Sequence, residues 1–236
     1  MVALITGGSR GLGAEVARVL SRDGYRVAIS YNRSIQQAAE VISGLEGPDA
    51  IALKADVADP AEVSRMAHIM ERLWGRLDVL VNNAGISRDS LLARTSETDW
   101  DLTMKVNLRG SFNTVRALSG MLQRTGNARI INISSRSALT GRGGQAAYSA
   151  SKSALIGLSL SMAREFASEG ICVNTVLPGY MQTEMGNAAP GAMETARSRS
   201  LLGTLGSVKD VASFISWLAG TSSVTGQVFS IDSRIG

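Results

Sequence analysis

Short apolar runs alternate along this chain with longer stretches in which apolar positions recur every three or four residues. The first five residues are apolar, and beyond the glycine-rich stretch 6–13 the residues Val16 and Leu20 continue at helical spacing up to Gly24. Residues 25–30 resume the apolar pattern of a strand. The amino-terminal part of the chain therefore predicts strand, glycine turn, helix and strand, which together form a βαβ unit.

The same alternation continues to the carboxyl-terminal end. Nearly continuous apolar strands predict a sheet that is covered on both faces, and repeated right-handed crossovers make such a sheet parallel and doubly wound. The pattern lapses over residues 180–204, where small, polar and methionine residues predict a covering segment, or lid, with short helices. Further strands are expected at 51–54, 77–81, 129–133, 171–177 and 228–231, and further helices at about 35–45, 60–74, 98–123, 148–167 and 208–218.

The start of the helix at 60–74 carries the strongest local signal. Asp59 is expected as the N-cap and Pro60 as the first helical residue. Glu62 is expected to complete a capping box by accepting a hydrogen bond from the backbone N–H of Asp59.

Composition supports a single globular α/β domain over residues 1–236. The chain has 44% hydrophobic residues and 25 glycines, which suit a large core with many tight turns. It has no charged region ahead of its first apolar run and no apolar run near the length of a membrane span, so a cytoplasmic location without membrane attachment is expected. The single cysteine, Cys172, lies in an apolar run and predicts a small buried side chain.

The net charge of +4 does not by itself indicate a nucleic-acid partner. The arginines are scattered, and no dense basic run is interleaved with aromatic residues. The charge suits a phosphorylated cofactor or substrate equally well. A metal site is not expected either, because His68 lies on the helix at 60–74, away from the strand ends, and no histidine or cysteine cluster exists in the sequence.

The main candidate catalytic residues are Tyr148 and Lys152, which lie one helical turn apart. A neighbouring ammonium stabilises a phenolate, so Lys152 is expected to lower the pKa of Tyr148 from its ordinary value of about 10. Ser135 follows a predicted strand and could hold a carbonyl oxygen beside that phenol, although the adjacent Ser134 competes for the same role. This combination predicts a proton donor that acts on an oxygen.

Five motifs occur together in one order, and most of them directly follow predicted strands. They are Thr6-Gly-x-x-x-Gly-x-Gly13, Asn82-Asn-Ala-Gly85, Ser135, Tyr148-x-x-x-Lys152 and Pro178-Gly179. These motifs resemble those of the short-chain dehydrogenase/reductase family, and the resemblance covers nearly the whole chain. It implies a single Rossmann-type domain, with a doubly wound parallel sheet of about seven strands and helices on both faces. It also implies a homotetramer that transfers hydride between a nicotinamide and a carbonyl or alcohol.

The resemblance implies a catalytic tetrad. Tyr148 would donate the proton, Ser135 would hold the substrate carbonyl, and Lys152 would bind the ribose hydroxyls of the cofactor as well as stabilise the phenolate. Asn107 would keep a water molecule in a proton relay to the lysine.

Cofactor choice is predicted from the end of the second strand. Enzymes that use NAD place an acid there to hold the ribose hydroxyls, and that acid would repel a 2'-phosphate. The corresponding stretch 31–33 has no acid, and Arg10 and Arg33 are expected to face the phosphate, so NADPH/NADP⁺ is predicted. By resemblance, Asp56 and Val57 would take the adenine, and Thr183 the nicotinamide carboxamide. The full predicted cofactor-binding set is Gly7, Ser9, Arg10, Gly11, Leu12, Gly13, Asn32, Arg33, Asp56, Val57, Asn83, Ala84, Gly85, Tyr148, Lys152, Pro178, Gly179 and Thr183.

Within the family, segments 85–94, 143–148 and 178–185 most resemble the enzymes of fatty acid synthesis that reduce 3-oxoacyl groups on acyl carrier protein. The implied reaction is NADPH-dependent reduction of a 3-oxoacyl thioester to the 3-hydroxyacyl form. Two departures limit it. Gly126 and Glu169 stand where arginines are expected to dock the acidic carrier, and the segment 229–236 differs from the usual Asp-Gly-Gly ending. Substitutes for the docking arginines would be Arg109, Arg124, Arg129 or Arg142.

Two other classes of function stay open. The chain could be a specialised polyketide-type ketoreductase or a dehydrogenase for a sugar, steroid or small diketone, because the predicted lid shapes the substrate pocket. A non-catalytic NADP-binding sensor is the other class. It would be expected to lose Tyr148 or Lys152, and both are present.

Overall fold

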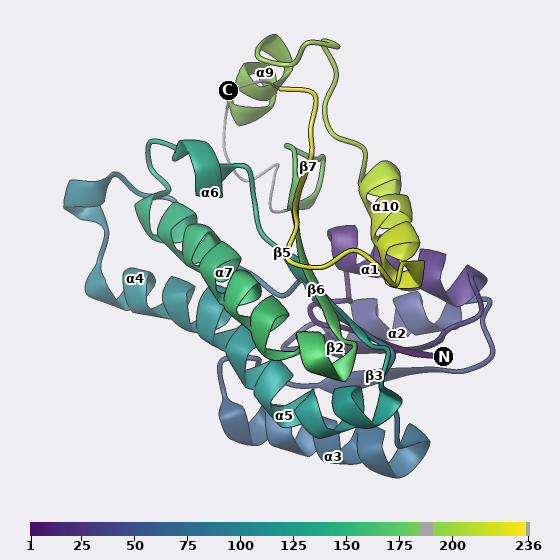
Figure 1. Ribbon diagram of the computed structural model, residues 1–236. Helices are drawn as coiled ribbons and strands as arrows, with labels where there is room; N and C mark the ends of the chain where they lie inside the picture. The colour runs from purple at the N-terminus through teal and green to yellow at the C-terminus, as the bar shows by residue number, and fades with distance from the viewer. Residues whose placement is uncertain (185–190, 235–236) are drawn as a thin grey trace.

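A twisted parallel sheet runs through the centre of the molecule in the computed structural model, which describes residues 1–184 and 191–234 (Figure 1). Within those residues the sheet has seven strands in the order β3-β2-β1-β4-β5-β6-β7. The order reverses between β1 and β4, which is where doubly wound sheets bind ligands. The strands are β1 (Val2–Ile5), β2 (Arg26–Tyr31), β3 (Ala50–Lys54), β4 (Val79–Asn82), β5 (Arg129–Ile133), β6 (Cys172–Pro178) and β7 (Val228–Ile231).

Helices cover both faces of the sheet because alternate strand residues point to opposite sides. Ala3 and Ile5 of β1 pack in one core cluster with α1 (Gly11–Arg22) and α10 (Val208–Gly220). Their neighbours in β1, Val2 and Leu4, pack in a second cluster. That second cluster includes residues of α3 (Pro60–Trp74), α5 (Gly110–Thr125) and α7 (Ala146–Glu165), while α2 (Ile35–Ser43) joins the first. The predicted doubly wound sheet with helices on both faces is confirmed.

The helix predicted over 98–123 is not a regular α-helix throughout. It consists of α4 (Glu97–Met104), a π-helical turn η2 (Lys105–Arg109) and α5, which follow one another without a break. Asn107 lies in the π turn, where its side chain is bound to the backbone of Ile86. Single π turns inside α-helices frequently mark functional sites, and this one points to Asn107.

Two helix starts differ from the sequence prediction. Helix α7 begins at Ala146, so Tyr148 lies within its first turn rather than opening it. Asp59 does cap α3 by accepting from the N–H of Ala61, but the second half of the predicted capping box is wrong. The Asp59 N–H is already bonded to the Asp56 carbonyl, so the Glu62 carboxylate accepts from the N–H of Asp56 instead, at 2.8 Å.

The predicted lid, residues 180–204, includes the short helix α9 (Ala192–Ser198). An isolated bridge ties Met181 to Gly206, and another ties Ser200 to Arg234. Residues 185–190 of the lid and 235–236 of the carboxyl-terminal segment lie outside the described residues, and the covering role of the segment stays a prediction. The remaining short elements are η1 (Leu92–Arg94), α6 (Ser137–Thr140) and η3 (Ala167–Glu169).

None of the helices in residues 1–184 and 191–234 combines the length and apolar character that crossing a membrane requires.

Candidate active site

The predicted site residues do meet along one edge of the sheet, at the carboxyl ends of the central strands. The glycine turn follows β1, Asn83 to Gly85 follow β4, Ser135 follows β5, and Gly179 follows β6. Parallel strands bring these loops together although they are far apart in sequence.

The glycine turn is shaped by close backbone packing. Gly7 and Gly11 have positive φ angles of 63° and 55°, which side chains with a Cβ rarely adopt. A Cβ on Gly7 would lie 2.9 Å from the Cα of Ala84, and one on Gly13 would lie 2.5 Å from the side-chain nitrogen of Asn83. The turn leads into α1, whose N-cap, Arg10, makes no side-chain capping bond. The helix amides are therefore available for an anionic group such as a pyrophosphate, and the cradle fits a dinucleotide.

The side chain of Asn83 is hydrogen-bonded to the glycine turn. Its amide donates to the carbonyls of Thr6 and Gly7, at 2.9 and 3.0 Å. The Thr6 hydroxyl in turn accepts from the backbone N–H groups of Asn83 and Ala84, each at 3.0 Å. The loop after β4 and the loop after β1 thus form one hydrogen-bonded unit.

Tyr148, Lys152 and Ser135 lie together at the start of α7. The ammonium nitrogen of Lys152 lies 5.9 Å from the centroid of the Tyr148 ring and donates to the carbonyl of Ile133 at 2.8 Å. The Ser135 hydroxyl lies close enough to Tyr148 to lower the pKa of that phenol. The competing Ser134 is buried and donates to the backbone carbonyl of Lys152 at 2.8 Å, so it fastens α7 to the end of β5. The geometry favours Ser135 over Ser134 as the group that faces a substrate.

Asn107 is fully buried, and both the oxygen and the nitrogen of its amide are hydrogen-bonded. Its oxygen accepts from the N–H of Ile86 at 2.8 Å, and its nitrogen donates to the Ile86 carbonyl and to the Ser151 hydroxyl, at 2.9 and 3.0 Å. A Cβ on Gly85 would come within 3.2 Å of the Asn107 oxygen and 3.4 Å of the Lys152 nitrogen. Gly85 therefore lets the loop after β4 approach both residues closely.

The pKa of Tyr148 moves in the direction opposite to the sequence prediction. Burial raises the pKa above its usual value, Asp89 raises it further, and only the hydrogen bond with Ser135 opposes them. Burial also lowers the pKa of Lys152 to about 8. Burial is the largest cause of both pKa shifts, because each group charges at a cost inside the molecule.

The predicted adenosine end of the site lies beyond β2. Arg33 is exposed and its side chain makes no hydrogen bond or ion pair with any residue that the structure describes, whereas Arg10 pairs with Glu184 at 2.6 Å. Asn32 donates to the carboxylate of Asp56 at 3.1 Å. The carbonyl of Val57 accepts from the side chain of Asn113 at 2.9 Å, and the predicted contribution of the Val57 backbone to adenine binding stays a prediction.

The loop after β6 lies opposite the glycine turn. The methyl carbon of Thr183 is 3.6 Å from the position of a Cβ on Gly11. Gly179 donates its N–H to Ile231 at 3.0 Å and packs so closely on Asp232 that a Cβ would lie 2.7 Å from that carboxylate. A cofactor lying in the turn would thus have this loop on its other side.

Three polar residues near Tyr148 were not singled out from the sequence. Ser151 donates to the Tyr148 carbonyl at 2.7 Å, and Ser137 and Gln145 form hydrogen bonds that lead away from Ser135. Gln145 lies in the segment 143–148 that carries the family resemblance, so that segment was the available signal. Among the described residues there is no cluster of three histidine, cysteine or acidic side chains able to hold a metal ion.

A family model, that of the short chain dehydrogenases, matches residues 1–194 of the chain. The chain belongs to this family. It is accordingly an oxidoreductase that acts on CH–OH and C=O groups, as the resemblance implied.

Individual short-chain dehydrogenases are similar over almost the full length. The 3-oxoacyl-[acyl-carrier-protein] reductase FabG of Staphylococcus aureus is 40% identical over 98% of this chain and 96% of its own. The 3-oxoacyl-[acyl-carrier-protein] reductase of Synechocystis is 38% identical over 98% of this chain and 95% of its own.

Two solved structures show the same fold. A dehydrogenase/reductase of Sinorhizobium meliloti superposes with a TM-score of 0.93 at 38% identity, over 99% of this chain and 94% of its own. A short chain dehydrogenase of Burkholderia cenocepacia, crystallised in complex with NADP, also gives a TM-score of 0.93 at 38% identity, over 98% of this chain and 96% of its own.

Proposed function

We propose that the protein is an NADPH-dependent reductase that converts 3-oxoacyl thioesters, carried on acyl carrier protein, into 3-hydroxyacyl thioesters for fatty acid synthesis. The observation that carries this proposal is the grouping of Ser135, Tyr148 and Lys152 beside the glycine turn. The relatives named as 3-oxoacyl-[acyl-carrier-protein] reductases, which match nearly the whole chain, support the choice of substrate.

Each residue of the tetrad has a task in that reaction. The bound nicotinamide supplies the hydride. As the ketone gains negative charge on its oxygen, Tyr148 donates a proton to that oxygen and Ser135 donates a hydrogen bond to it. Lys152 holds a positive charge near the phenolate that forms. Asn107, in the π turn, ties the loop at Ile86 to the helical stretch that carries it.

The residues at the cofactor site support NADPH. No acid stands at the end of β2, and the exposed Arg33 there can meet a 2'-phosphate with its planar guanidinium. A related short chain dehydrogenase was crystallised with NADP.

The arginines considered for carrier docking differ in burial and pairing. Arg129 is buried and its guanidinium donates to the carbonyls of Asn127 and Ala128, so its suggested role in docking is wrong. Arg124 is exposed but is already paired with the carboxylate of Glu71, at 2.7 Å. The remaining candidates, Arg109 and Arg142, are exposed, and we propose that they receive the acidic carrier.

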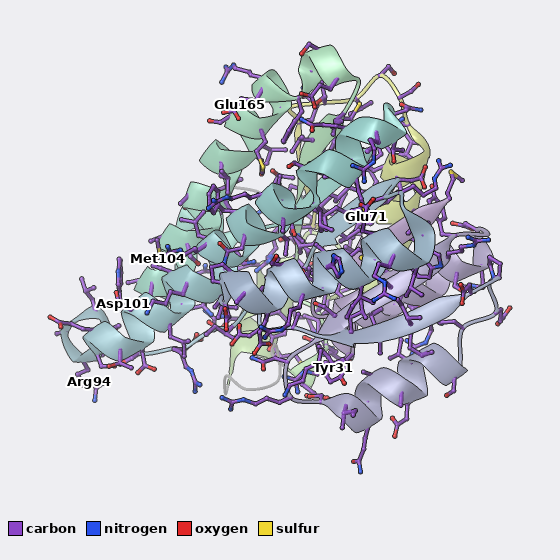
Figure 2. All side chains as sticks on the ribbon, turned by 90° about the horizontal axis from the view of Figure 1, so that it is seen from below. Tyr31, Glu71, Arg94, Asp101, Met104 and Glu165 are labelled. Carbon is purple, nitrogen blue, oxygen red and sulfur yellow. The ribbon has the colours of Figure 1, made fainter. Side chains whose placement is uncertain are left out.

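We further propose that the protein assembles as a homotetramer in the cytoplasm. Large apolar side chains are exposed on α4 and α5, at Trp100, Leu102 and Phe112, and on α10 at Trp217. In Figure 2, α4 with Asp101 and Met104 extends away from the body of the molecule. Apolar surface at two separate places is what a protein with two kinds of subunit contact requires.

The decisive experiment compares wild type with Tyr148→Phe. NADPH oxidation is followed by absorbance with a 3-oxoacyl group on acyl carrier protein, on coenzyme A and as a free diketone. We expect the carrier-bound substrate to give the highest kcat/KM and the variant to lose about 10²–10⁴-fold in kcat, since a general acid contributes that much. Cofactor binding, measured by NADPH fluorescence, should persist. Unchanged turnover in the variant would refute the assignment of Tyr148, and preference for the free diketone would refute that of the substrate.

A further inference from the structure

Ser135 is the first member of a chain of hydrogen bonds that leads away from Tyr148. Its hydroxyl donates to the hydroxyl of Ser137 at 3.3 Å, and the N–H of Ser137 donates back to it at 3.2 Å. Ser137 then donates to the side-chain carbonyl of Gln145 at 3.3 Å. The side-chain nitrogen of Gln145 donates to the carboxylate of Asp89 at 2.8 Å. Four side chains from three segments thus form one chain that ends at an ionised group.

Asp89 fixes the orientation of the Gln145 amide. An ionised carboxylate only accepts hydrogen bonds, so the nitrogen of the amide must face Asp89 and the oxygen must face Ser137. Gln145 is buried, which raises the cost of any orientation that leaves one of these groups unpaired. The carboxylate of Asp89 therefore determines, for every hydrogen bond from Gln145 to Ser135, which group donates.

That direction has a consequence for Ser135. Because the Ser137 hydroxyl donates to Gln145, the Ser137 oxygen accepts from Ser135. The Ser135 hydroxyl thus donates to the Ser137 oxygen and accepts from the Ser137 N–H. The hydroxyl bond, at 3.3 Å, is longer than the usual 2.7–2.8 Å, and the N–H bond, at 3.2 Å, is longer than the usual 2.9–3.0 Å, so both are weak. They keep the Ser135 side chain in place without preventing its hydrogen from turning to a stronger acceptor, such as a carbonyl oxygen that gains charge.

We propose that Gln145, oriented by Asp89, is a positioning residue for the reduction: through Ser137 it holds Ser135 where the substrate carbonyl must bind. The inference rests on the proposed function, to which it adds two residues, Gln145 and Asp89, that do not themselves touch the reacting atoms.

The backbone around Gln145 does not depend on this amide. The Gln145 N–H donates to Arg142 and its carbonyl accepts from Ser149, at 3.0 and 2.8 Å, and the side chain makes no capping bond to α7. A substitution that keeps the size of the side chain leaves these bonds intact. Loss of activity in such a variant would consequently report on the amide rather than on the helix start.

The test compares Gln145→Met, which keeps the volume but removes both amide groups, with a matched control, Gln123→Met. Gln123 also donates to a carboxylate, that of Glu169, but on an exposed surface. We expect Gln145→Met to lower kcat by about 10–100-fold with the KM for the ketone changed less than threefold, because the lost interaction acts mainly in the transition state. The control should stay within twofold of wild type. A Gln145→Met variant that also stays within twofold would overturn the proposal.

A double variant tests the donor direction itself. Gln145→Glu alone sets two carboxylates against each other and should lose activity as Gln145→Met does. Combined with Asp89→Asn, the new carboxylate can accept both from the amide at position 89 and from Ser137, which restores the original direction at the same net charge. We expect kcat to return to within about fivefold of wild type. Failure of the double variant to recover, while its folding and cofactor binding are normal, would overturn the proposed direction.

Crystal structures of wild type and Gln145→Met give a readout that does not depend on the substrate. The Ser135 hydroxyl should leave its position beside Tyr148 in the variant, and an unchanged Ser135 would count against the proposal even for an enzyme with another substrate. Failure of the proposed function is recognised separately: wild type would then not reduce 3-oxoacyl thioesters, or Tyr148→Phe would remain active.

Discussion

Lys152 is the residue at which burial and charge oppose each other most directly. Only 4% of it is exposed, and its side-chain nitrogen donates to the carbonyl of Ile133 at 2.8 Å. Burial lowers the pKa of Lys152 to about 8, which puts its charge change close to neutral pH. Keeping Lys152 charged in the folded protein, as a reductase needs, therefore lowers the free energy of unfolding.

This cost predicts a pH dependence of stability. The pKa of Lys152 is about 8 in the folded protein and close to 10.5 when unfolded, so between those values the unfolded chain binds the extra proton. Stability therefore rises with pH through this window. Relative to Lys152→Met, the free energy of unfolding of wild type should gain about 1.4 kcal/mol per pH unit, to a total of about 3 kcal/mol. Urea titrations without cofactor at pH 7 to 10 measure the difference.

Other titrating groups are common to wild type and Lys152→Met, so their contributions cancel in the comparison. Parallel stability curves for the two proteins would show that Lys152 does not titrate in this range.

The sequence located the candidate residues but not their environments. Tyr148 and Lys152 are one turn apart on a helix, and helical geometry alone puts them side by side. The raised pKa of Tyr148 could not be predicted, because it depends on burial and on Asp89, which belongs to another loop. The choice between Ser134 and Ser135 likewise required the structure, because it depends on the hydrogen bond from the Ser134 hydroxyl to the backbone carbonyl of Lys152.

At the scale of elements, the contact between the loops after β1 and β4 fixes the shape of the glycine turn. The hydroxyl of Thr6, which is 1% exposed, accepts from two successive backbone N–H groups after β4, those of Asn83 and Ala84. No regular strand pairing supplies these contacts. One side chain therefore sets how the two loops lie against each other.

Thr6→Val tests this contact between the loops. Valine keeps the shape of threonine but leaves the N–H of Ala84 without its acceptor, while the N–H of Asn83 keeps its bond to the Val81 carbonyl at 3.1 Å. Since a buried unpaired polar group costs about 1–3 kcal/mol, we expect a loss of that size in the free energy of unfolding and weaker cofactor binding. Urea denaturation and NADPH fluorescence measure the two effects.

Thr103→Val is the matched control. Thr103 is also buried, but its hydroxyl only donates to the carbonyl of Asp99 within its own helix, at 2.7 Å. Its loss should stay below about 1 kcal/mol. Equal losses in the two threonine variants would argue against a special role of the contact between the loops.

Element existence was predictable, and the irregular turns were not. Apolar runs bounded by polar residues place each strand within two residues of its position, as with 171–177 against Cys172–Pro178. The π turn at Lys105–Arg109 leaves the apolar spacing of a helix almost unchanged, and the residue that occupies it is bonded to Ile86, which lies before α4 in the chain. A pattern read over one helix does not contain that contact.

For the whole molecule, the exposed apolar side chains on α4 and α5 predict the assembly. Phe112 is 44% exposed and lies under the guanidinium of Arg116, 6.0 Å from the ring centroid. Phe112→Glu would put a charge into the proposed contact, so we expect the tetramer of 24.8 kDa chains to dissociate into dimers or monomers. Sedimentation velocity measures the change.

Phe112→Leu serves as the control for assembly, because it keeps the surface apolar and should remain tetrameric. A wild-type protein that sediments as a monomer, or a Phe112→Glu variant that stays tetrameric, would contradict the proposed contact.

The strand order also fixes the sequence in which the molecule can be built on the ribosome. Strands β1 to β4 all come from the first 82 residues and are neighbours in the sheet, so the nucleotide-binding half can pair while the rest of the chain is still being made. The edge of β4 then waits for β5, whose residues 129–133 are synthesised only after α4 and α5. Until β5 pairs with it, the apolar edge of β4 is open to other nascent chains, and this is the stage of biosynthesis at which the fold most needs protection from aggregation.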